Sequence, residues 1–524
     1  MNMSVSNIIT TYIPQGLSTK VHGRYIECEI SQDQLKTMCE SLSRIHGLPL
    51  KTMVAKDERK RNGMWNIFYV FGVPNENVYI VPFISIRDSH EFLSMTSVMP
   101  SVAFYEREIR EFFGLNPIGH PNPGRWLLHN NWPEGVYPLR KDFDVHTRPE
   151  EEQRQNVFGE LAGEGVFEIP VGPVHAGIIE PGHFRFGMAG EEIISLEPRL
   201  GYTHKGIEKL FETLPIDQKI ALSERVSGDS SFTHSMAFCM ALEELAGVSV
   251  PTRGQYLRVI FSELERLVNH IGDVGLILLG TAYTFGSSQG ARLRERVMQT
   301  HERLTGSRFL RGVNTIGGVT RDVIKSECVR LQEELREIKK EFSEVIGVVD
   351  KSIAVFNRLS NTGTLPTQTA KDFGAVGILA RGSGIARDAR KDFPYAVYDE
   401  LQFTVATEGS GDVFARFQVR VKEIFSSFSI LQDALTQIPD GQHCSKDHIY
   451  FTPETFSVSV VEGWRGDIVY FVATDSTGSI SRVHVRDASF LNWPLFSYFS
   501  PGNVVLDFPL INKSCNLSYS GNDK

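Results

Sequence analysis

Residues 256–279 read YLRVIFSELERLVNHIGDVGLILL, and the spacing of their apolar side chains predicts the architecture of most of the chain. Apolar residues recur at the i, i+3, i+4 and i+7 positions that form one face of an α-helix. These positions are Leu257, Ile260, Phe261, Leu264, Leu267 and Val268. A second helical stretch, 325–357, also has its apolar residues roughly on one stripe. Amphipathic helices bury such faces against one another, so we predict a large, mainly helical bundle domain.

Small β-sheets are expected around this bundle. Strand-like runs occur at 169–186 and 192–199, before the helical region. Near the end, 467–474 and 480–485 flank Asp475-Ser476-Thr477-Gly478, which is typical of a β-hairpin turn. We therefore expect these sheets at the periphery of the large domain.

The first 145 residues predict a separate, small α/β domain. Helical character covers 32–46. Two apolar runs, 66–73 and 78–86, flank the turn residues 74–77, which predicts a β-hairpin. A second helix is expected over 101–113, ending at Gly114. A polar, charged stretch follows and favours a linker. The predicted organisation is α+β, with a small domain over 1–145, a linker over 146–165 and the large domain over 166–524.

Composition excludes several classes of protein. The chain has 524 residues, 41% of them hydrophobic and 22% charged, which is typical of a globular protein. A formal net charge of -9 argues against binding to nucleic acid. No run approaches the ~18 apolar residues of a membrane span, and the first residues resemble no export signal. We expect a cytoplasmic chain whose membrane contact comes through partners.

The six cysteines form no metal-binding pattern. They are Cys28, Cys39, Cys239, Cys328, Cys444 and Cys515. None belongs to a C-x-x-C pair, so neither a zinc site nor a cluster site is indicated. We expect buried, reduced thiols.

Charged and aromatic motifs of the small domain occur in a distinctive order. They are Glu106-Arg107-Glu108, Phe113-Gly114-Leu115, Gly119-His120-Pro121 and Pro138-Leu139-Arg140-Lys141-Asp142-Phe143. This order resembles the signature of the 30-kDa (C-type) subunit of complex I. Because charged residues alternate with aromatic ones here, we interpret Glu106, Arg107, Glu108, Arg140, Lys141 and Asp142 as residues that dock on a partner protein.

A second series of motifs runs through the large domain. It includes Gly172-Pro173-Val174-His175, the run RLGYTHKGIEK at 199–209, IGGV at 316–319, Arg381-Gly382-Ser383-Gly384 and Gly411-Asp412. The series resembles the 49-kDa (D-type) subunit of complex I and the large subunit of group 4 nickel–iron hydrogenases. The run 172–186 resembles the formate-hydrogenlyase type more closely than complex I itself. The two resemblances together imply a fusion of the 30-kDa and 49-kDa types.

The resemblance also locates a metal site that lacks its ligands. A nickel–iron hydrogenase holds its metals through two C-x-x-C pairs, because these metals prefer soft thiolates that bridge them. The corresponding positions here are Ser227, Ser230, Ser489 and Asn492. Neutral hydroxyl and amide groups are poor ligands for such a centre, so we expect no nickel–iron centre and no hydrogenase activity. Without metal insertion, we also expect 494–524 to remain attached.

Quinone chemistry in the manner of complex I is not clearly indicated either. The 49-kDa subunit of complex I also lacks these cysteines, and the resemblance implies that a tyrosine and a histidine there hold the quinone. The tyrosine position is Gly228 here, and the histidine loop contains His175 and then diverges, with His183 as the next candidate.

Several residues remain as site candidates, each with a simpler structural interpretation. Glu180, in Ile179-Glu180-Pro181-Gly182-His183, resembles the hydrogenase glutamate that passes protons, or it is a capped glutamate in a turn. His175 and His183 are candidates for the same proton relay or acceptor site, or structural histidines.

Three further candidates are charged. Arg381, Asp388 and Arg390 are candidates for a cavity wall, or simply structural ion pairs. Asp229 and His234, in the degenerate metal loop, are weaker candidates for holding water or a cation.

The resemblance implies two functions. In the first, the chain is an oxidoreductase-complex subunit on the cytoplasmic face of a bacterial inner membrane. It would take part in electron transfer from an adjacent iron–sulfur subunit to a quinone or another acceptor, coupled to ion movement. In the second, it is a non-catalytic structural or coupling subunit.

The implied partners are an iron–sulfur small subunit like the B-type subunit of complex I, a ferredoxin-like subunit and antiporter-like membrane subunits. We expect no cofactor on this chain itself. The sequence has no glycine-rich fingerprint after a strand, so NADH would bind another subunit.

Overall fold

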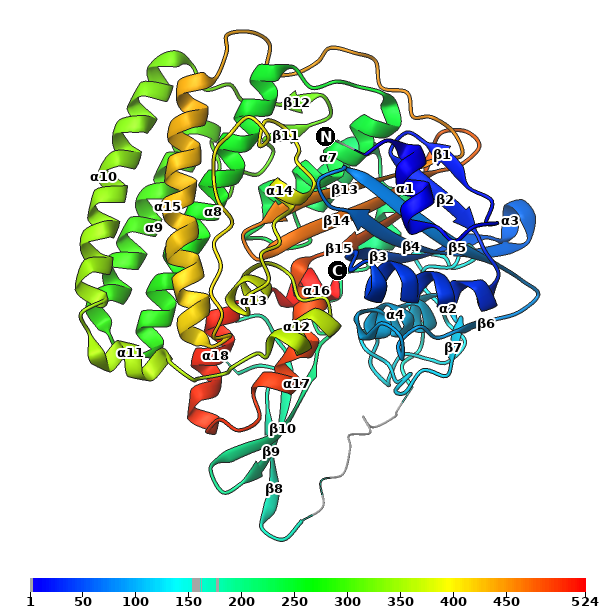
Figure 1. Ribbon diagram of the computed structural model, residues 1–524, viewed down its shortest axis with the longest axis horizontal. Coiled ribbons are helices and arrows are strands. Elements are labelled where there is room, and N and C mark those ends of the chain that lie inside the picture. Colours follow the sequence, from blue (N-terminus) through cyan, green and yellow to red (C-terminus); the bar gives the residue numbers. More distant parts are fainter. Residues whose placement is uncertain (1–2, 153–160, 162, 176–178) are drawn as a thin grey trace.

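The computed structural model describes residues 3–152, 161, 163–175 and 179–524. The amino-terminal domain is built on a five-stranded sheet with the order β1-β2-β5-β4-β3 (Figure 1). Its strands are β1 (Lys20–His22), β2 (Tyr25–Glu29), β3 (Leu50–Glu58), β4 (Met64–Val73) and β5 (Val78–Arg87). β4 and β5 pair antiparallel, which confirms the predicted hairpin.

Helices α1 (Val5–Tyr12), α2 (Gln32–Glu40) and α4 (Ala103–Phe113) pack on this sheet, and the short helix α3 (Arg59–Asn62) joins β3 to β4 (Figure 1). A capping box between Ser31 and Gln34 starts α2, and α2 continues as one π-helical turn, Ser41–Ile45. α4 ends where Gly114 takes the left-handed conformation, with φ 71°, as the sequence predicted. Two short strands, β6 (Glu91–Leu93) and β7 (Asn116–Ile118), pair in parallel.

Long helices dominate the large domain. They are α7 (Ser231–Ala246), α8 (Thr252–Gly280), α9 (Thr284–Thr305), α10 (Lys325–Val349) and α15 (Val413–Gln437). α8, α9, α10 and α15 lie side by side in Figure 1, whereas α7 lies against the strand β13 (Phe456–Gly463). The predicted helix over 256–279 lies within α8, and its six predicted core residues are buried. The predicted single helix over 325–357 is wrong: α10 ends at Val349, and Ser352 caps a new helix, α11 (Ile353–Leu359).

Shorter helices connect these elements and form the carboxy-terminal region. They are α5 (Ile207–Thr213), α6 (Ile216–Ser223), α12 (Thr367–Asp372), α13 (Gly377–Gly382), α14 (Ala389–Asp392), α16 (Ala488–Asn492), α17 (Phe496–Phe499), α18 (Phe508–Cys515) and α19 (Tyr519–Asp523). Short 3₁₀ turns occur at Pro100–Val102, Trp493–Leu495 and Val505–Asp507. No helix in the described ranges combines the length and the apolar character needed to cross a bilayer.

Three small sheets belong to the large domain. β8 (Val166–Val171), β9 (His183–Ala189) and β10 (Glu192–Arg199) form an antiparallel sheet that projects at the lower edge of Figure 1. The predicted strand over 169–186 is interrupted, since β8 ends at Val171 and β9 starts at His183. β11 (Asn314–Thr315) and β12 (Gly318–Val319) form a short pair.

The third sheet, β13 (Phe456–Gly463), β14 (Gly466–Thr474) and β15 (Ile480–Arg486), includes the predicted hairpin. It does not lie at the periphery, as predicted, but between α7 and the amino-terminal sheet (Figure 1). Apolar side chains of both sheets form one buried cluster: Tyr25, Val54, Phe68, Val70, Tyr79 and Val81 against Phe456, Val458, Val460, Val469, Phe471 and Ala473. The α+β class is confirmed, and the two predicted domains share this core. The predicted linker, 146–165, includes residues outside the described ranges and stays a prediction.

Candidate functional site

The four degenerate ligand positions are buried. Ser227 and Ser230 lie in the loop before α7, whereas Ser489 and Asn492 lie in α16. The two pairs meet around Ser518: its hydroxyl lies 2.9 Å from Ser227 Oγ, and its backbone N–H donates to Ser489 Oγ at 3.0 Å. The fold therefore brings together the two segments that the sequence identified, although they are more than 250 residues apart.

The other polar side chains of this region also have hydrogen-bond or ion-pair partners. Asn492 exchanges hydrogen bonds with the backbone of Val376, at 3.2 and 3.1 Å. Asp229 forms a bidentate ion pair with Arg465, at 2.6 and 2.6 Å. Burial opposes ionisation of Asp229, but Arg465 holds the pKa of this carboxyl below its ordinary value. Asp229 thus neutralises an arginine, and no thiolate is present at the four positions to hold nickel or iron. The donor set does not fit a nickel–iron centre.

His234 is also held inside the protein. Its ring nitrogens lie 3.0 Å from Tyr470 Oη and 3.0 Å from the Asp487 carboxylate. Burial would raise the pKa of Asp487, but the His234 hydrogen bond and nearby Arg465 hold it well below its ordinary value.

The segment 516–524 runs between residues 227–230 and residues 489–492, the two segments with the degenerate ligand positions, which are called the degenerate loops below. All residues from Leu517 to Lys524 are buried. Glu180 accepts hydrogen bonds from the backbone N–H groups of Tyr519 and Ser520, both at 3.1 Å. The carboxylate that resembles a proton relay therefore anchors this segment in the structure.

The two candidate histidines have different surroundings. The His175 ring lies 5.8 Å from the Phe184 ring and 6.5 Å from that of Tyr519, and partial burial lowers its pKa. His183 begins β9, and its Nδ1 lies 3.3 Å from the Gly172 carbonyl oxygen. The fold thus brings Glu180 and His175 to Tyr519, whereas His183 contacts the end of β8.

Arg381, Asp388 and Arg390 belong to a buried ion-pair network. Arg381 contacts Glu423 at 2.7 Å and Glu462 at 2.8 Å. Arg390 contacts Asp388 at 2.7 Å and Glu263 at 2.9 Å. The network joins α13 and α14 to α8, α15 and β13, which is the geometry of structural ion pairing.

The predicted docking residues of the small domain make contacts within the chain. The Glu106 carboxylate accepts hydrogen bonds from Ser94, Thr96 and the N–H of Met95. Lys141 pairs with Glu212 of α5 at 2.7 Å. The remaining members also have intramolecular partners: Arg107 with Gly124 and Arg125, Glu108 with Lys524, Arg140 with Phe113, and Asp142 with Arg59. Glu108 and Lys141 join the two domains, and the interpretation of the set as partner-docking residues stays a prediction.

The sequence did not reveal a cavity of about 220 Å³ between α8 and α9. Its lining includes Asp229, Asn269, Asp273, Leu276, Arg294 and Met298. A smaller pocket beside it includes Glu265, whose pKa burial raises to about 7. The sequence signal for this polar cavity was the presence of charged residues in the middle of the apolar α8 stretch, because charged residues are buried only together with partners.

Comparison with known proteins agrees with both motif series. Residues 28–149 match the family described as "Respiratory-chain NADH dehydrogenase, 30 Kd subunit", and residues 282–459 and 450–524 match "Respiratory-chain NADH dehydrogenase, 49 Kd subunit". Formate hydrogenlyase subunit 5 of Escherichia coli is 34% identical over 91% of this chain and 84% of its own length.

Two further relatives extend this result. Hydrogenase-4 component G of Escherichia coli is 37% identical over 91% of this chain and 84% of its own length. The C/D subunit of NADH-quinone oxidoreductase from Phocaeicola vulgatus is 32% identical over 75% of this chain and 79% of its own length. Since both domains match, and in the same order as in these relatives, the chain belongs to the family of fused 30-kDa and 49-kDa complex I subunits that includes formate hydrogenlyase subunit 5 and hydrogenase-4 component G.

Proposed function

We propose that this chain is the large subunit of a membrane-associated oxidoreductase complex related to complex I and to energy-converting hydrogenases. In that complex it takes part in electron transfer from an adjacent iron–sulfur subunit to a quinone or another acceptor, coupled to ion translocation. The observation that carries the proposal is the match of both domains to subunits of such oxidoreductases, over 84% of the length of a relative.

The chain itself carries no nickel–iron centre in this proposal. Ser227 and Ser489 offer neutral oxygens that already bond to Ser518, and Asn492 bonds to backbone. The cluster that delivers electrons belongs to a neighbouring subunit.

The cavity between α8 and α9 is the candidate place for an acceptor. At about 220 Å³ it is larger than the ~150 Å³ cavity that holds benzene in an engineered protein, so a six-membered ring has room. Arg294 supplies hydrogen-bond donors, and Leu276 and Met298 supply apolar surface. This combination suits a quinone head group.

A second candidate function is a non-catalytic coupling subunit. It is favoured by the segment 516–524, which occupies the space between the degenerate loops and bonds to Ser227, Ser489 and Glu180. In this alternative the fold is retained to connect other subunits.

The proposed partners are an iron–sulfur subunit like the B-type subunit of complex I, a ferredoxin-like subunit and antiporter-like membrane subunits. They would place the chain at the cytoplasmic face of a bacterial inner membrane, and NADH, where used, would bind another subunit. The test is to attach an affinity tag at the amino-terminal end, because Lys524 is buried, and to solubilise membranes gently. Mass spectrometry is expected to find iron–sulfur and antiporter-like subunits. Recovery from the soluble fraction without them would overturn the assignment.

The same preparation separates the two candidate functions. Ala291 lines the cavity and is exposed at its edge, so Ala291→Trp is expected to fill it. If the cavity binds the acceptor, quinone reduction by the captured complex falls at least tenfold, while the exposed control Ala189→Trp has no effect. Unchanged quinone reduction in Ala291→Trp, or none in the wild type, would favour the coupling subunit.

A further inference from the structure

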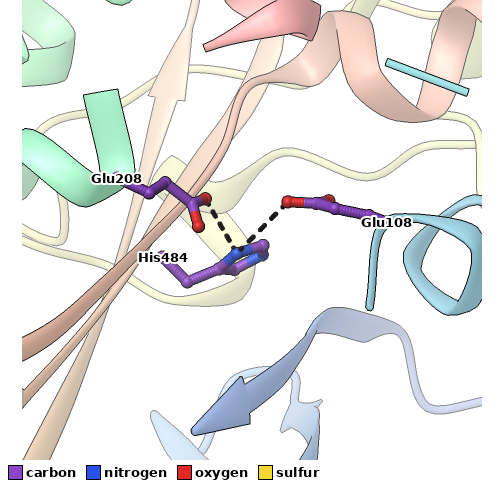
Figure 2. Close-up of side chains that lie close together, drawn as sticks. All are labelled: Glu108, Glu208 and His484. Carbon is purple, nitrogen blue, oxygen red and sulfur yellow. Dashed lines mark ion pairs between the residues drawn. The ribbon is translucent and has the colours of Figure 1, made fainter. Parts of the chain in front are cut away.

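Two carboxylates and one imidazole from separate elements converge on one buried point (Figure 2). Glu108 belongs to α4, Glu208 to α5 and His484 to β15. One ligand atom of each lies within 4.8 Å of the others. His484 Nδ1 is 3.0 Å from Glu208 and 4.0 Å from Glu108. Carboxylate and imidazole groups at this spacing are the donor set of a divalent cation site.

The side chain of Lys524 supplies a positive charge at this point. Its Nζ is 2.6 Å from Glu108 Oε1 and 3.1 Å from Glu208 Oε1. Nζ also lies 4.9 Å from the centre of the Phe490 ring. Lys524 is only 2% exposed, so this ammonium is held away from water.

The charges of this cluster balance only when Lys524 is present. Arg482 pairs with Glu208 at 2.7 Å and supplies a counter-charge for that carboxylate. Among the described residues, Lys524 is the only lysine or arginine that pairs with Glu108. Without this ammonium, one buried carboxylate would lack a counter-charge, which is strongly unfavourable.

Neighbouring contacts hold the backbone next to Lys524. Thr203 donates through its N–H and hydroxyl to the Asp523 carboxylate, at 2.9 and 2.6 Å. The N–H of Lys205 donates to the Lys524 carbonyl oxygen at 2.8 Å. The Lys524 side chain is the contact that extends from this segment to the amino-terminal domain, through Glu108 of α4.

We infer that the ammonium of Lys524 acts as the cation of the Glu108–Glu208–His484 site. Its binding there holds 516–524 between the degenerate loops and links the large domain to the amino-terminal domain. This role is independent of whether the chain reduces a quinone. The Lys524 ammonium explains how the protein itself neutralises a group of side chains that could otherwise bind a metal ion.

The test compares Lys524→Met with the wild type and with Lys371→Met, which changes an exposed lysine of α12. The full chain is studied with its tag at the amino-terminal end. In EDTA, Lys524→Met is expected to lower the melting temperature by several degrees. Hydrogen exchange at the amides of 519–521 is expected to be at least tenfold faster. Wild-type exchange at these amides in Lys524→Met would overturn the inference.

Added Mn²⁺ tests the cation site directly. Because Lys524→Met leaves two carboxylates and an imidazole without the ammonium, Mn²⁺ is expected to raise the melting temperature of this variant and to leave the wild type unchanged. No effect of Mn²⁺ on the variant, or the same effect on both proteins, would show that the ammonium does not occupy a cation site.

A second set of variants covers the case in which Lys524→Met does not fold. Glu108→Gln retains Lys524 and its Glu208 contact, and it is expected to accelerate exchange at 519–521 by itself. In the double variant Glu108→Gln/Lys524→Met, the loss of melting temperature should be smaller than the sum of the two single losses. A wild-type rate of hydrogen exchange at 519–521 in Glu108→Gln would contradict this link between the domains. So would additive losses of melting temperature, where both single variants fold.

Discussion

Serine at positions 227 and 489 changes what this region can bind. A hydroxyl both donates and accepts a hydrogen bond, whereas a thiolate is suited to a soft metal. Ser227 uses this capacity with Ser518 and Asp229, and Ser489 accepts from the Ser518 N–H. A protein segment rather than a metal is therefore the matching occupant of these positions.

Glu265 is a buried carboxylate whose ionisation should oppose folding. It belongs to α8, and its oxygens accept from the N–H groups of Phe232 and Thr233 at the start of α7, at 2.7 and 3.1 Å. Burial nevertheless raises its pKa from 4.5 to about 7. The folded protein thus retains a proton that the unfolded chain loses, so the free energy of unfolding falls as the pH rises from about 4.5 to about 7. The full effect of this one group is about 3 kcal/mol.

Glu265→Gln is expected to flatten this pH dependence. The measurement is the free energy of unfolding by urea between about pH 5 and about pH 7.5, the range in which linkage places the loss of this proton. Glu344→Gln, at an exposed position of α10, serves as the control and should retain the wild-type slope. An equal slope in Glu265→Gln and wild type would show that Glu265 does not titrate in this range.

At the scale of elements, the tight approach of α13 to the β13–β14 turn depends on a glycine. Gly377 has a φ of +61°, and a Cβ atom there would lie 1.8 Å from the Arg465 carbonyl oxygen. Arg465 is the residue that pairs with Asp229 in the degenerate loop. The packing of two elements and the position of a site residue therefore depend on the same backbone contact.

Gly377→Ala is expected to destabilise the protein by more than about 3 kcal/mol, because both the left-handed backbone and the contact with Arg465 resist a side chain. Gly347→Ala is the matched control. Gly347 is exposed within α10 and has open space around its Cβ position, so alanine should stabilise the protein by about 0.5–1 kcal/mol. Thermal unfolding measures both changes, and equal shifts would refute the contact argument.

At the scale of the whole molecule, the interface between the two sheets joins the predicted domains. Phe68 of β4 packs 5.8 Å from the Phe456 ring and 5.5 Å from the Phe471 ring. Lys51 of β3 forms a buried ion pair with Asp467 of β14 at 2.8 Å. Because apolar and ionic contacts both cross this interface, we expect the two domains to unfold together.

Phe68→Ala is expected to lower the free energy of unfolding by about 3–4 kcal/mol, through lost burial and the resulting cavity. Phe285→Ala, where the side chain is 48% exposed, should change it by roughly 0.5 kcal/mol or less. Urea unfolding monitored by circular dichroism compares the two. Equal effects of both substitutions would show that the sheet interface contributes little to stability.

Local patterns predicted the elements that are marked by helical spacing or by turn residues. The α8 periodicity, the β4–β5 and β14–β15 hairpins and the end of α4 at Gly114 were all visible in this way. β13 and β14 are both buried at every residue, so neither shows the alternation of a half-exposed strand. β14 was located by the turn residues 475–478 that follow it, whereas β13 is followed by Trp464-Arg465, which are not typical turn residues, and was missed. The break between α10 and α11 was missed because only three residues, Asp350, Lys351 and Ser352, separate the two helices and apolar residues continue on both sides.

The sequence by itself determined the family, the order of the two domains and the loss of all four thiolate ligands, because each of these is a matter of residue identity. Only the tertiary structure showed that 516–524 occupies the space between the degenerate loops and that Lys524 neutralises Glu108 and Glu208. The physical reason is distance along the chain. Ser518 meets Ser227 from 291 positions away, and Lys524 meets Glu108 from 416, and contacts of that kind leave no periodic signal in the residues that make them.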